Sequence, residues 1–442
     1  MVKKIFITAL FVLATLAGYA QVQPTTQLLG TWSGKLNALG SSLTMVFHLE
    51  QADGYVTIEL DVPDSGVKGI GCYKDYLSDD SIAVTIQMIS ATYCAKLKDG
   101  ELDGVFSQHG MSFPLKLKPG AEKLNRPQTP QPPFPYTEEE LSFQNDGFTF
   151  HGTLTLPEVY SKETPMLVMV TGSGQQDRDE ELMDHRPFAV IADVLARHGI
   201  ATFRYDDRGW DDKSFPYLDY TVKHHKSDAE AALRMMRERF AYVGVIGHSE
   251  GGTIGLMLAG EGKVDCCISL AGMAVSGKET LLEQNNTLLT SHGVPSVIVN
   301  SYCEALGKAF DDIAAGESPD NIDDSKVPPL MKENFKAAVK QAATPYMRSL
   351  LMTDVRQSLP SVKCPVLALG GNRDIQVNAA INLEAIDKGL ANSKHEVVAY
   401  SDLNHLFQHC QTGLVNEYRT IEETIAPEVL TRIVEWIKSL KR

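Results

Sequence analysis

The chain has 442 residues, of which 43% are hydrophobic and 22% are charged, and its formal net charge is -15 at pH 7. This is ordinary globular composition, and the length indicates two or three domains. A surface this acidic repels nucleic acid and anionic membranes, and the sequence holds no basic stripe, so neither is an expected partner.

The first twenty residues have the pattern of a signal peptide. Lys3 and Lys4 precede an apolar run over residues 5–17, and the small residues Gly18 and Ala20 follow where a signal peptidase cleaves. A membrane anchor is the alternative, but the apolar run is too short to span a bilayer comfortably. We therefore expect an exported protein, periplasmic or extracellular, with no membrane association after cleavage of residues 1–20.

The chain contains seven cysteines, in no spacing typical of a zinc site. Export implies an oxidising compartment. Cys72 and Cys94 fall in one small segment, and a disulfide and a pair of buried free thiols are equally favoured for them. We expect neither a metal nor an organic cofactor.

Residues 21–122 are expected to form a small antiparallel β domain. Alternating apolar residues predict strands that include residues 44–49, 56–60 and 82–86, with Gly-containing turn signals between the strands. Five prolines then occur between Pro127 and Pro135, which predicts a stiff linker over residues 123–137.

From residue 138 to 442 the pattern changes to strands that alternate with helices. Such alternation predicts an α/β fold, with a parallel sheet covered by helices on both faces. The expected strands include residues 166–170, 201–205, 242–246, 266–270, 366–369 and 396–400. The helix-rich segment 277–360 interrupts this pattern and is expected to form a cap over the site; a peripheral helical decoration is the alternative.

A nucleophile motif follows the strand predicted at 242–246, in the run Gly247-His248-Ser249-Glu250-Gly251. A small-residue helix is predicted directly after it. Strand, G-x-S-x-G and helix together predict a nucleophile elbow, in which a sharp turn exposes the serine hydroxyl at the carboxyl end of the strand. We therefore expect Ser249 to be the catalytic nucleophile.

A serine nucleophile needs a base and an acid, which in this fold follow in the order Ser, Asp or Glu, His. Asp374 lies in a tight loop after the strand predicted at 366–369, and His405 follows the strand predicted at 396–400. Asp374 is favoured over Glu384 and Asp387, which are expected inside the next helix. His405 is favoured over His409, its main rival.

The oxyanion hole is expected to use two backbone N–H groups. One belongs to Glu250, directly after the nucleophile, and the other to Ser173 in the glycine-rich loop 171–178, with Gly174 as the alternative. Gly174, Gln175 and Arg178 are expected to contact substrate, although the charges around Arg178 also suit ion pairs that hold loops. The loop lacks the lysine and spacing of a phosphate-binding loop.

Four runs together resemble bacterial α/β-hydrolase-fold serine esterases of the serine aminopeptidase and prolyl-oligopeptidase-like clan, in particular those with a small N-terminal β domain. The runs are Gly172-Ser173-Gly174-Gln175-Gln176-Asp177-Arg178-Asp179, Asp207-Arg208-Gly209, Gly247 to Gly252, and Asn404-His405-Leu406-Phe407-Gln408. The resemblance covers about 300 residues from Tyr136 onward. It implies a Ser249, Asp374 and His405 triad, a helical cap, and activity on short acyl esters. Gln175 departs from the family pattern, which usually has proline there.

The sequence thus predicts a secreted serine carboxylesterase with an α/β-hydrolase fold, preceded by a small all-β domain. Its expected substrate is a small-molecule or saccharide acyl ester. A serine peptidase or aminopeptidase of the same fold, an acyl thioesterase and a binding protein without catalysis are the alternatives. The oligomeric state is left open, with a homodimer included.

Overall fold

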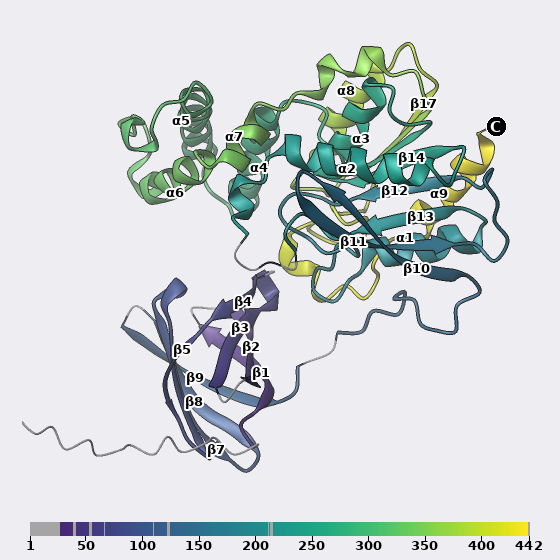
Figure 1. Ribbon diagram of the computed structural model, residues 1–442. Coiled ribbons are helices and arrows are strands. Elements are labelled where there is room, and N and C mark those ends of the chain that lie inside the picture. The colour runs from purple at the N-terminus through teal and green to yellow at the C-terminus, as the bar shows by residue number, and fades with distance from the viewer. Residues whose placement is uncertain are drawn as a thin grey trace, which may run out of the picture. The chain divides into compact units, whose positions relative to one another are not determined.

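The computed structural model describes residues 27–38, 41–52, 55–65, 67–108, 110–121, 124–210, 212 and 215–440, and Figure 1 shows their elements. The chain divides into two compact units, Met1–Lys123 and Leu124–Arg442. The segment expected to be a signal peptide, residues 1–20, lies outside the described residues. Within the described residues, no helix is both long and apolar enough to cross a membrane.

The first unit is one antiparallel sheet of nine strands, in the order β4-β3-β2-β1-β9-β8-β7-β6-β5, which curls until it is nearly closed. The strands are β1 (Gly30–Ala38), β2 (Ser41–Ala52), β3 (Tyr55–Val62), β4 (Val67–Gly71), β5 (Tyr73–Leu77), β6 (Ser81–Ile86), β7 (Ala91–Lys98), β8 (Glu101–Gln108) and β9 (Met111–Pro119). Alternate residues face inward, as the period-two pattern predicts. Phe47 and Tyr93 stack in this core, with ring centroids 5.1 Å apart.

Cys72 and Cys94 are free thiols in the structure, so of the two alternatives the disulfide is wrong. Cys94 lies on the exposed face of β7, between inward-facing residues, whereas Cys72 is half-buried. Burial, and next the charge of Glu59, raise the pKa of the Cys72 thiol to about 12, so it is a poor nucleophile.

The second unit is built on an eight-stranded sheet in the order β10-β11-β13-β12-β14-β15-β16-β17. Strands β12 (Met166–Val170), β13 (Ala201–Tyr205), β14 (Val243–His248), β15 (Cys267–Leu270), β16 (Val366–Gly371) and β17 (His395–Tyr400) are parallel. The hairpin of β10 (Thr137–Asn145) and β11 (Phe148–Leu156) adds an antiparallel edge. The chain reverses its direction of winding between β12 and β14, where parallel sheets place their ligands.

Helices cover both faces of this sheet, as expected (Figure 1). On one face α2 (Val222–Arg237), α3 (Glu250–Gly260) and α8 (Ala379–Gly389) share a core with the sheet. On the other face α1 (Pro187–Arg197) and α9 (Pro427–Ser439) do so. This is the α/β-hydrolase fold, preceded by an all-β unit, which confirms the fold expected from the sequence.

Four helices between β15 and β16 form the segment expected to be a cap. They are α4 (Gly277–Ser291), α5 (Ser296–Ala314), α6 (Lys332–Ala342) and α7 (Pro345–Leu351). Helices α4 to α7 have a small hydrophobic core of their own, centred on Leu306, Ile313 and Phe335. Helix α7 also packs against α2 of the main sheet layer, so the cap reaches the body of the second unit there.

The proline-rich segment belongs to the second unit, where it is bound to the surface. The Arg126 guanidinium donates to the carbonyls of Met183, Arg419 and Ile421, at 2.7–3.1 Å. Gln128 likewise donates to the Ile425 carbonyl and accepts from the Thr424 N–H. These hydrogen bonds tie residues 124–128 to the chain before α9.

A buried ion pair joins the loop after β13 to α2, beside the β10–β11 turn. Arg208 Nη2 donates to Asp228 Oδ1 at 2.6 Å, and Nε donates to Oδ2 at 3.0 Å. The side chains are 6% and 0% exposed. Asn145 and Tyr220 also donate to the Asp228 carboxylate, whereas Asp146, on the turn itself, pairs with Arg208 from a 55% exposed position. Asp228 is therefore the centre of this network.

Replacement of Asp228 by alanine is expected to lower the free energy of unfolding by about 3–5 kcal/mol, because it removes the buried partner of a guanidinium. Asp146→Ala removes the exposed partner of the same arginine and is expected to cost at most about 1 kcal/mol. Urea unfolding of both variants measures the difference. Equal losses would contradict the assignment of Asp228 as the centre.

Candidate active site

Ser249 occupies a strained backbone position between β14 and α3. Its φ is 53° and its ψ is -118°, a conformation that residues other than glycine rarely adopt. The turn is possible because its neighbours lack side chains. A Cβ on Gly247 would lie 2.1 Å from the Gly251 carbonyl oxygen, and one on Gly251 would lie 2.0 Å from the Val170 carbonyl oxygen. The strained serine and the close approach of its glycine neighbours are the features of the nucleophile elbow that the motif predicts.

The helix after Ser249 directs unsatisfied N–H groups toward the nucleophile. The Ser249 N–H donates to the Leu270 carbonyl of β15 at 2.8 Å, and the Ser249 carbonyl accepts from Thr253 N. The Glu250 N–H, in the first turn of α3, has no intrahelical acceptor by the geometry of a helix start. This N–H and the helix dipole are suited to stabilise a negative oxygen beside Ser249.

Asp374 and His405 form a buried pair at the ends of β16 and β17. Asp374 Oδ2 lies 2.6 Å from His405 Nδ1, and the side chains are 0% and 6% exposed. The other carboxylate oxygen accepts from the backbone N–H groups of Gln376 and Val377 at 2.7 and 2.8 Å. The Asp374 carboxylate accepts a hydrogen bond from Nδ1–H of His405. The other ring nitrogen, Nε2, is therefore unprotonated and can act as the base.

The rivals considered for acid and base have other partners. Glu384 and Asp387 lie on α8 and pair with Lys388 and His395 at the surface. His409 is half-exposed and pairs with Glu423 and Glu428.

His248, directly before the nucleophile, contacts the loop of the catalytic histidine. Its Nε2 donates to the His405 carbonyl oxygen at 2.9 Å, and the two ring centroids lie 4.7 Å apart. The residue directly before Ser249 therefore contacts both the backbone and the ring of His405, which lies 156 positions after Ser249 in the sequence. The three expected triad residues thus gather at the carboxyl ends of β14, β16 and β17.

The loop after β12 lies against the nucleophile. A Cβ on Gly172 would lie 3.3 Å from the Ser249 Cβ, so the loop passes directly beside the serine. Ser173 is exposed, and its hydroxyl donates to Glu250 Oε2 at 3.2 Å. The two residues expected to supply the oxyanion N–H groups are therefore hydrogen-bonded to each other through their side chains.

The Glu250 carboxylate is the centre of a buried cluster that sequence reasoning missed. Tyr346, on cap helix α7, donates its hydroxyl to Glu250 Oε2 at 2.6 Å. His225, on α2, lies 3.2 Å from Glu250 Oε1. The Glu250 side chain is 1% exposed. No local sequence signal points to Tyr346 or His225, because each reaches Glu250 from a distant segment.

Charges in this cluster are balanced by burial and mutual contact. Burial raises the pKa of Asp207 to about 7, against the opposing effect of His225. Burial alone would lower the pKa of His225, but its hydrogen bond to Glu250 and the charge of Asp207 raise it overall. Burial and the Glu250 charge hold the pKa of Tyr346 well above its usual range, so the phenol stays a donor. The Glu250 carboxylate is thus stabilised locally by Tyr346 and His225.

Two of the three residues expected to bind substrate, Gln175 and Arg178, make hydrogen bonds that hold the loop after β12. Arg178 makes a bidentate contact with Asp206 and further hydrogen bonds to Glu140 and Thr153. These contacts are the loop-holding ion pairs that the sequence also suggested for Arg178, and its contact with substrate stays a prediction. The Gln175 amide donates to the Arg208 carbonyl at 2.7 Å and holds the same loop.

Gly174 is an open position in the same loop, and its expected contact with substrate stays a prediction. Its φ is +95°, and a Cβ there would meet no described atom within 4 Å. In the part of the chain that the structure describes, no group of three or more His, Cys, Asp or Glu side chains is arranged to hold a metal.

No family model matches the chain. The esterase EstD of Thermotoga maritima is 27% identical over 277 residues, which are 61% of this chain and 61% of that protein, so the chain matches about three fifths of the relative's length. Est1E of Butyrivibrio proteoclasticus is 15% identical, over 68% of this chain and 97% of that one, with a TM-score of 0.38. The esterase Pf2001 of Pyrococcus furiosus is 14% identical, over 72% and 98%, with a TM-score of 0.41.

Replacement of Tyr346 by phenylalanine is expected to slow the labelling of Ser249 by a fluorophosphonate by about tenfold, because a hydrogen bond to a buried carboxylate contributes about 1.5–3 kcal/mol. Without this hydrogen bond, α7 is no longer attached to the residue that follows Ser249. Tyr302→Phe, in the core of the cap, is the matched control. Mass spectrometry of the labelled protein gives both rates, and equal rates for the two variants would show that Tyr346 does not support the site.

Proposed function

We propose that this chain is an exported serine carboxylesterase that hydrolyses short-chain acyl esters through an acyl-enzyme on Ser249. The observation that carries the proposal is the strained elbow at Ser249, with the buried Asp374–His405 pair held beside it by His248. The name of the Thermotoga maritima relative, an esterase, supports ester substrates.

In the acylation step, His405 Nε2 takes the proton of the Ser249 hydroxyl as its oxygen attacks the ester carbonyl carbon. The carbonyl π electrons move to the oxygen, and the Glu250 N–H and the loop at Ser173 stabilise the resulting oxyanion. Asp374 stabilises the imidazolium through Nδ1. The oxyanion collapses, the bond to the alcohol oxygen breaks, and His405 gives its proton to the leaving alcohol.

In the deacylation step, water repeats the attack on the acyl-enzyme. His405 takes a proton from the water as its oxygen adds to the acyl carbon. The bond to Ser249 then breaks, and the proton on His405 returns to the serine oxygen. The carboxylic acid leaves, and the enzyme is restored without a co-reactant.

An acidic side chain one residue after the nucleophile would oppose an oxyanion if its charge were free. Glu250 is such a residue, but Tyr346 and Ser173 donate to one of its oxygens and His225 lies against the other. The carboxylate is therefore compensated on its own side, and its backbone N–H remains suited to the oxyanion. This arrangement supports acyl transfer at Ser249.

The preference for short acyl groups is supported by the position of α7. The Tyr346 hydroxyl on this cap helix donates to the side chain of Glu250, the residue directly after the nucleophile, at 2.6 Å. A cap helix that is bonded to the residue after the nucleophile favours acetyl and other short acyl groups over long acyl chains. Export is supported by the signal-peptide pattern of residues 1–20.

The test is a panel of nitrophenyl esters and aminoacyl nitroanilides with the purified protein. We expect kcat/KM to be highest for acetyl to butyryl esters and to fall about tenfold or more for dodecanoyl esters, as each added methylene must fit beneath the cap. Ser249→Ala is expected to lower kcat by about 10³-fold or more, with folding retained by circular dichroism.

Two outcomes would overturn the proposal. Cleavage of aminoacyl nitroanilides with a kcat/KM above that for any ester would indicate a peptidase of the same fold. Full ester hydrolysis by Ser249→Ala would remove the acyl-enzyme mechanism altogether.

A further inference from the structure

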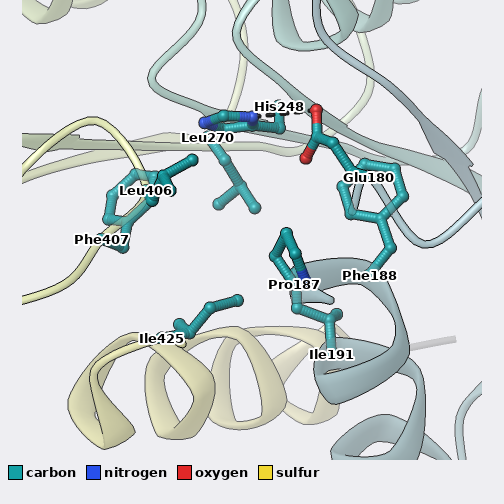
Figure 2. A pocket seen from close by; sticks show the side chains of 9 residues that line it. All are labelled: Glu180, Pro187, Phe188, Ile191, His248, Leu270, Leu406, Phe407 and Ile425. Atoms are coloured by element: carbon teal, nitrogen blue, oxygen red, sulfur yellow. Dashed lines mark hydrogen bonds and ion pairs between the residues drawn. The ribbon is translucent and has the colours of Figure 1, made fainter. Parts of the chain in front are cut away.

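His248 lies immediately before the nucleophile, yet neither of its ring nitrogens faces a substrate. Figure 2 shows the ring beside the Glu180 carboxylate, with a dashed line between them. His248 Nδ1 lies 3.0 Å from Glu180 Oε1, and Nε2 donates to the His405 carbonyl oxygen at 2.9 Å. The His248 and Glu180 side chains are 9% and 5% exposed.

These contacts fix the proton content of the pair. A backbone carbonyl can only accept, so His248 Nε2 carries a proton. A carboxylate can also only accept, so the Nδ1 contact needs a second proton, which lies between Nδ1 and Oε1. Burial opposes a charged ring, but the charge of Glu180 raises the pKa of His248 overall. The contact and this direction both favour the shared proton on His248 Nδ1, so that the ring is charged and faces the Glu180 carboxylate.

Glu180 extends this link to the loop expected to hold the oxyanion. The oxygen that faces His248 also accepts from the Gly172 N–H at 2.7 Å. One charged pair thus connects the backbone of the loop after β12, the residue before Ser249 on β14, and the backbone of His405 after β17. The elements that carry these groups come from three separate parts of the chain.

The surroundings of Glu180 leave His248 as its charged partner. The other carboxylate oxygen, Oε2, is buried and has no hydrogen-bond partner within the described residues. A small cavity adjoins the pair, with a volume of about 10 Å³. Apart from Glu180 and His248, its lining is apolar (Figure 2): Pro187, Phe188, Ile191, Leu270, Leu406, Phe407 and Ile425. Solvation of the carboxylate by this cavity is weak, so pairing through Oε1 carries its stabilisation.

We propose that His248 is a positioning residue, which in its charged form and paired with Glu180 holds the His405 loop and the Gly172 loop in register with Ser249. The inference rests on the proposed esterase function and adds a role for a residue that does not touch the substrate. Misplacement of reacting groups by about 1 Å can lower the rate about 100-fold. Loss of the His248–Glu180 pair is therefore expected to affect kcat more than KM.

The charge of His248 also acts on the catalytic base. The ring faces Glu180 on one side and the His405 ring, with Asp374 behind it, on the other. The His248–Glu180 pair is neutral as a whole. Loss of the imidazolium charge would leave a net negative charge beside His405, which favours the protonated form of the base. The acid limb of the pH profile reports this change, which a purely structural role would not produce.

The test is the pH dependence of kcat/KM for nitrophenyl acetate in His248→Gln, which removes the charge but keeps an N–H donor. We expect kcat to fall about tenfold or more and KM to change little. We also expect the acid limb to move to higher pH by about half a unit or more, as a nearby charge requires. His409→Asn, which breaks an exposed histidine–carboxylate pair four residues from His405, is the matched control and should behave as the unmodified enzyme.

Glu180→Gln keeps the proposal testable if His248→Gln does not fold. Without the carboxylate, His248 loses its second proton more easily, so activity should begin to fall at a lower pH on the alkaline side. Acid and alkaline limbs that match those of the His409→Asn control in both variants would overturn the positioning role. Failure of the proposed function is distinguishable, because it would appear as full activity in Ser249→Ala.

Discussion

The backbone of Ser249 is the constraint on which the rest of the site depends. A serine with φ of 53° and ψ of -118° is strained, and it persists because β14 enters and α3 leaves the turn in fixed positions. The absence of side chains at Gly247 and Gly251 lets the helix start pack onto the end of the sheet. Strand order then decides which loops meet at this point, since parallel strands present their carboxyl ends on one edge.

Both neighbours of Ser249 carry a buried charge, and each charge links the elbow to a different part of the fold. His248 connects it to the loops of Glu180 and His405. Glu250 connects it to α2 and to cap helix α7, through His225 and Tyr346. A charge buried without a partner is costly, so both clusters hold their segments firmly. The nucleophile is therefore positioned by its neighbours from two opposite sides.

Sequence patterns predicted the parts of the site that follow from strand ends. Asp374 and His405 were expected there, and the structure joins them by a hydrogen bond of 2.6 Å. Contacts that depend on tertiary packing had no such signal. Tyr346 reaches Glu250 from a cap whose internal packing the local sequence does not specify. The β10–β11 hairpin was missed because its first strand begins Thr137-Glu138-Glu139-Glu140, an acidic run that is stable as an edge strand through pairing with arginines.

The central claim is that the Ser249 oxygen becomes covalently acylated during turnover. Acid quenching of the enzyme in the steady state with nitrophenyl acetate, followed by peptide mass mapping, measures this directly. We expect the peptide that contains Ser249 to carry one acetyl group, and the modification to disappear once the substrate is exhausted. Continued hydrolysis with no acetylated Ser249 peptide at any time would contradict the claim.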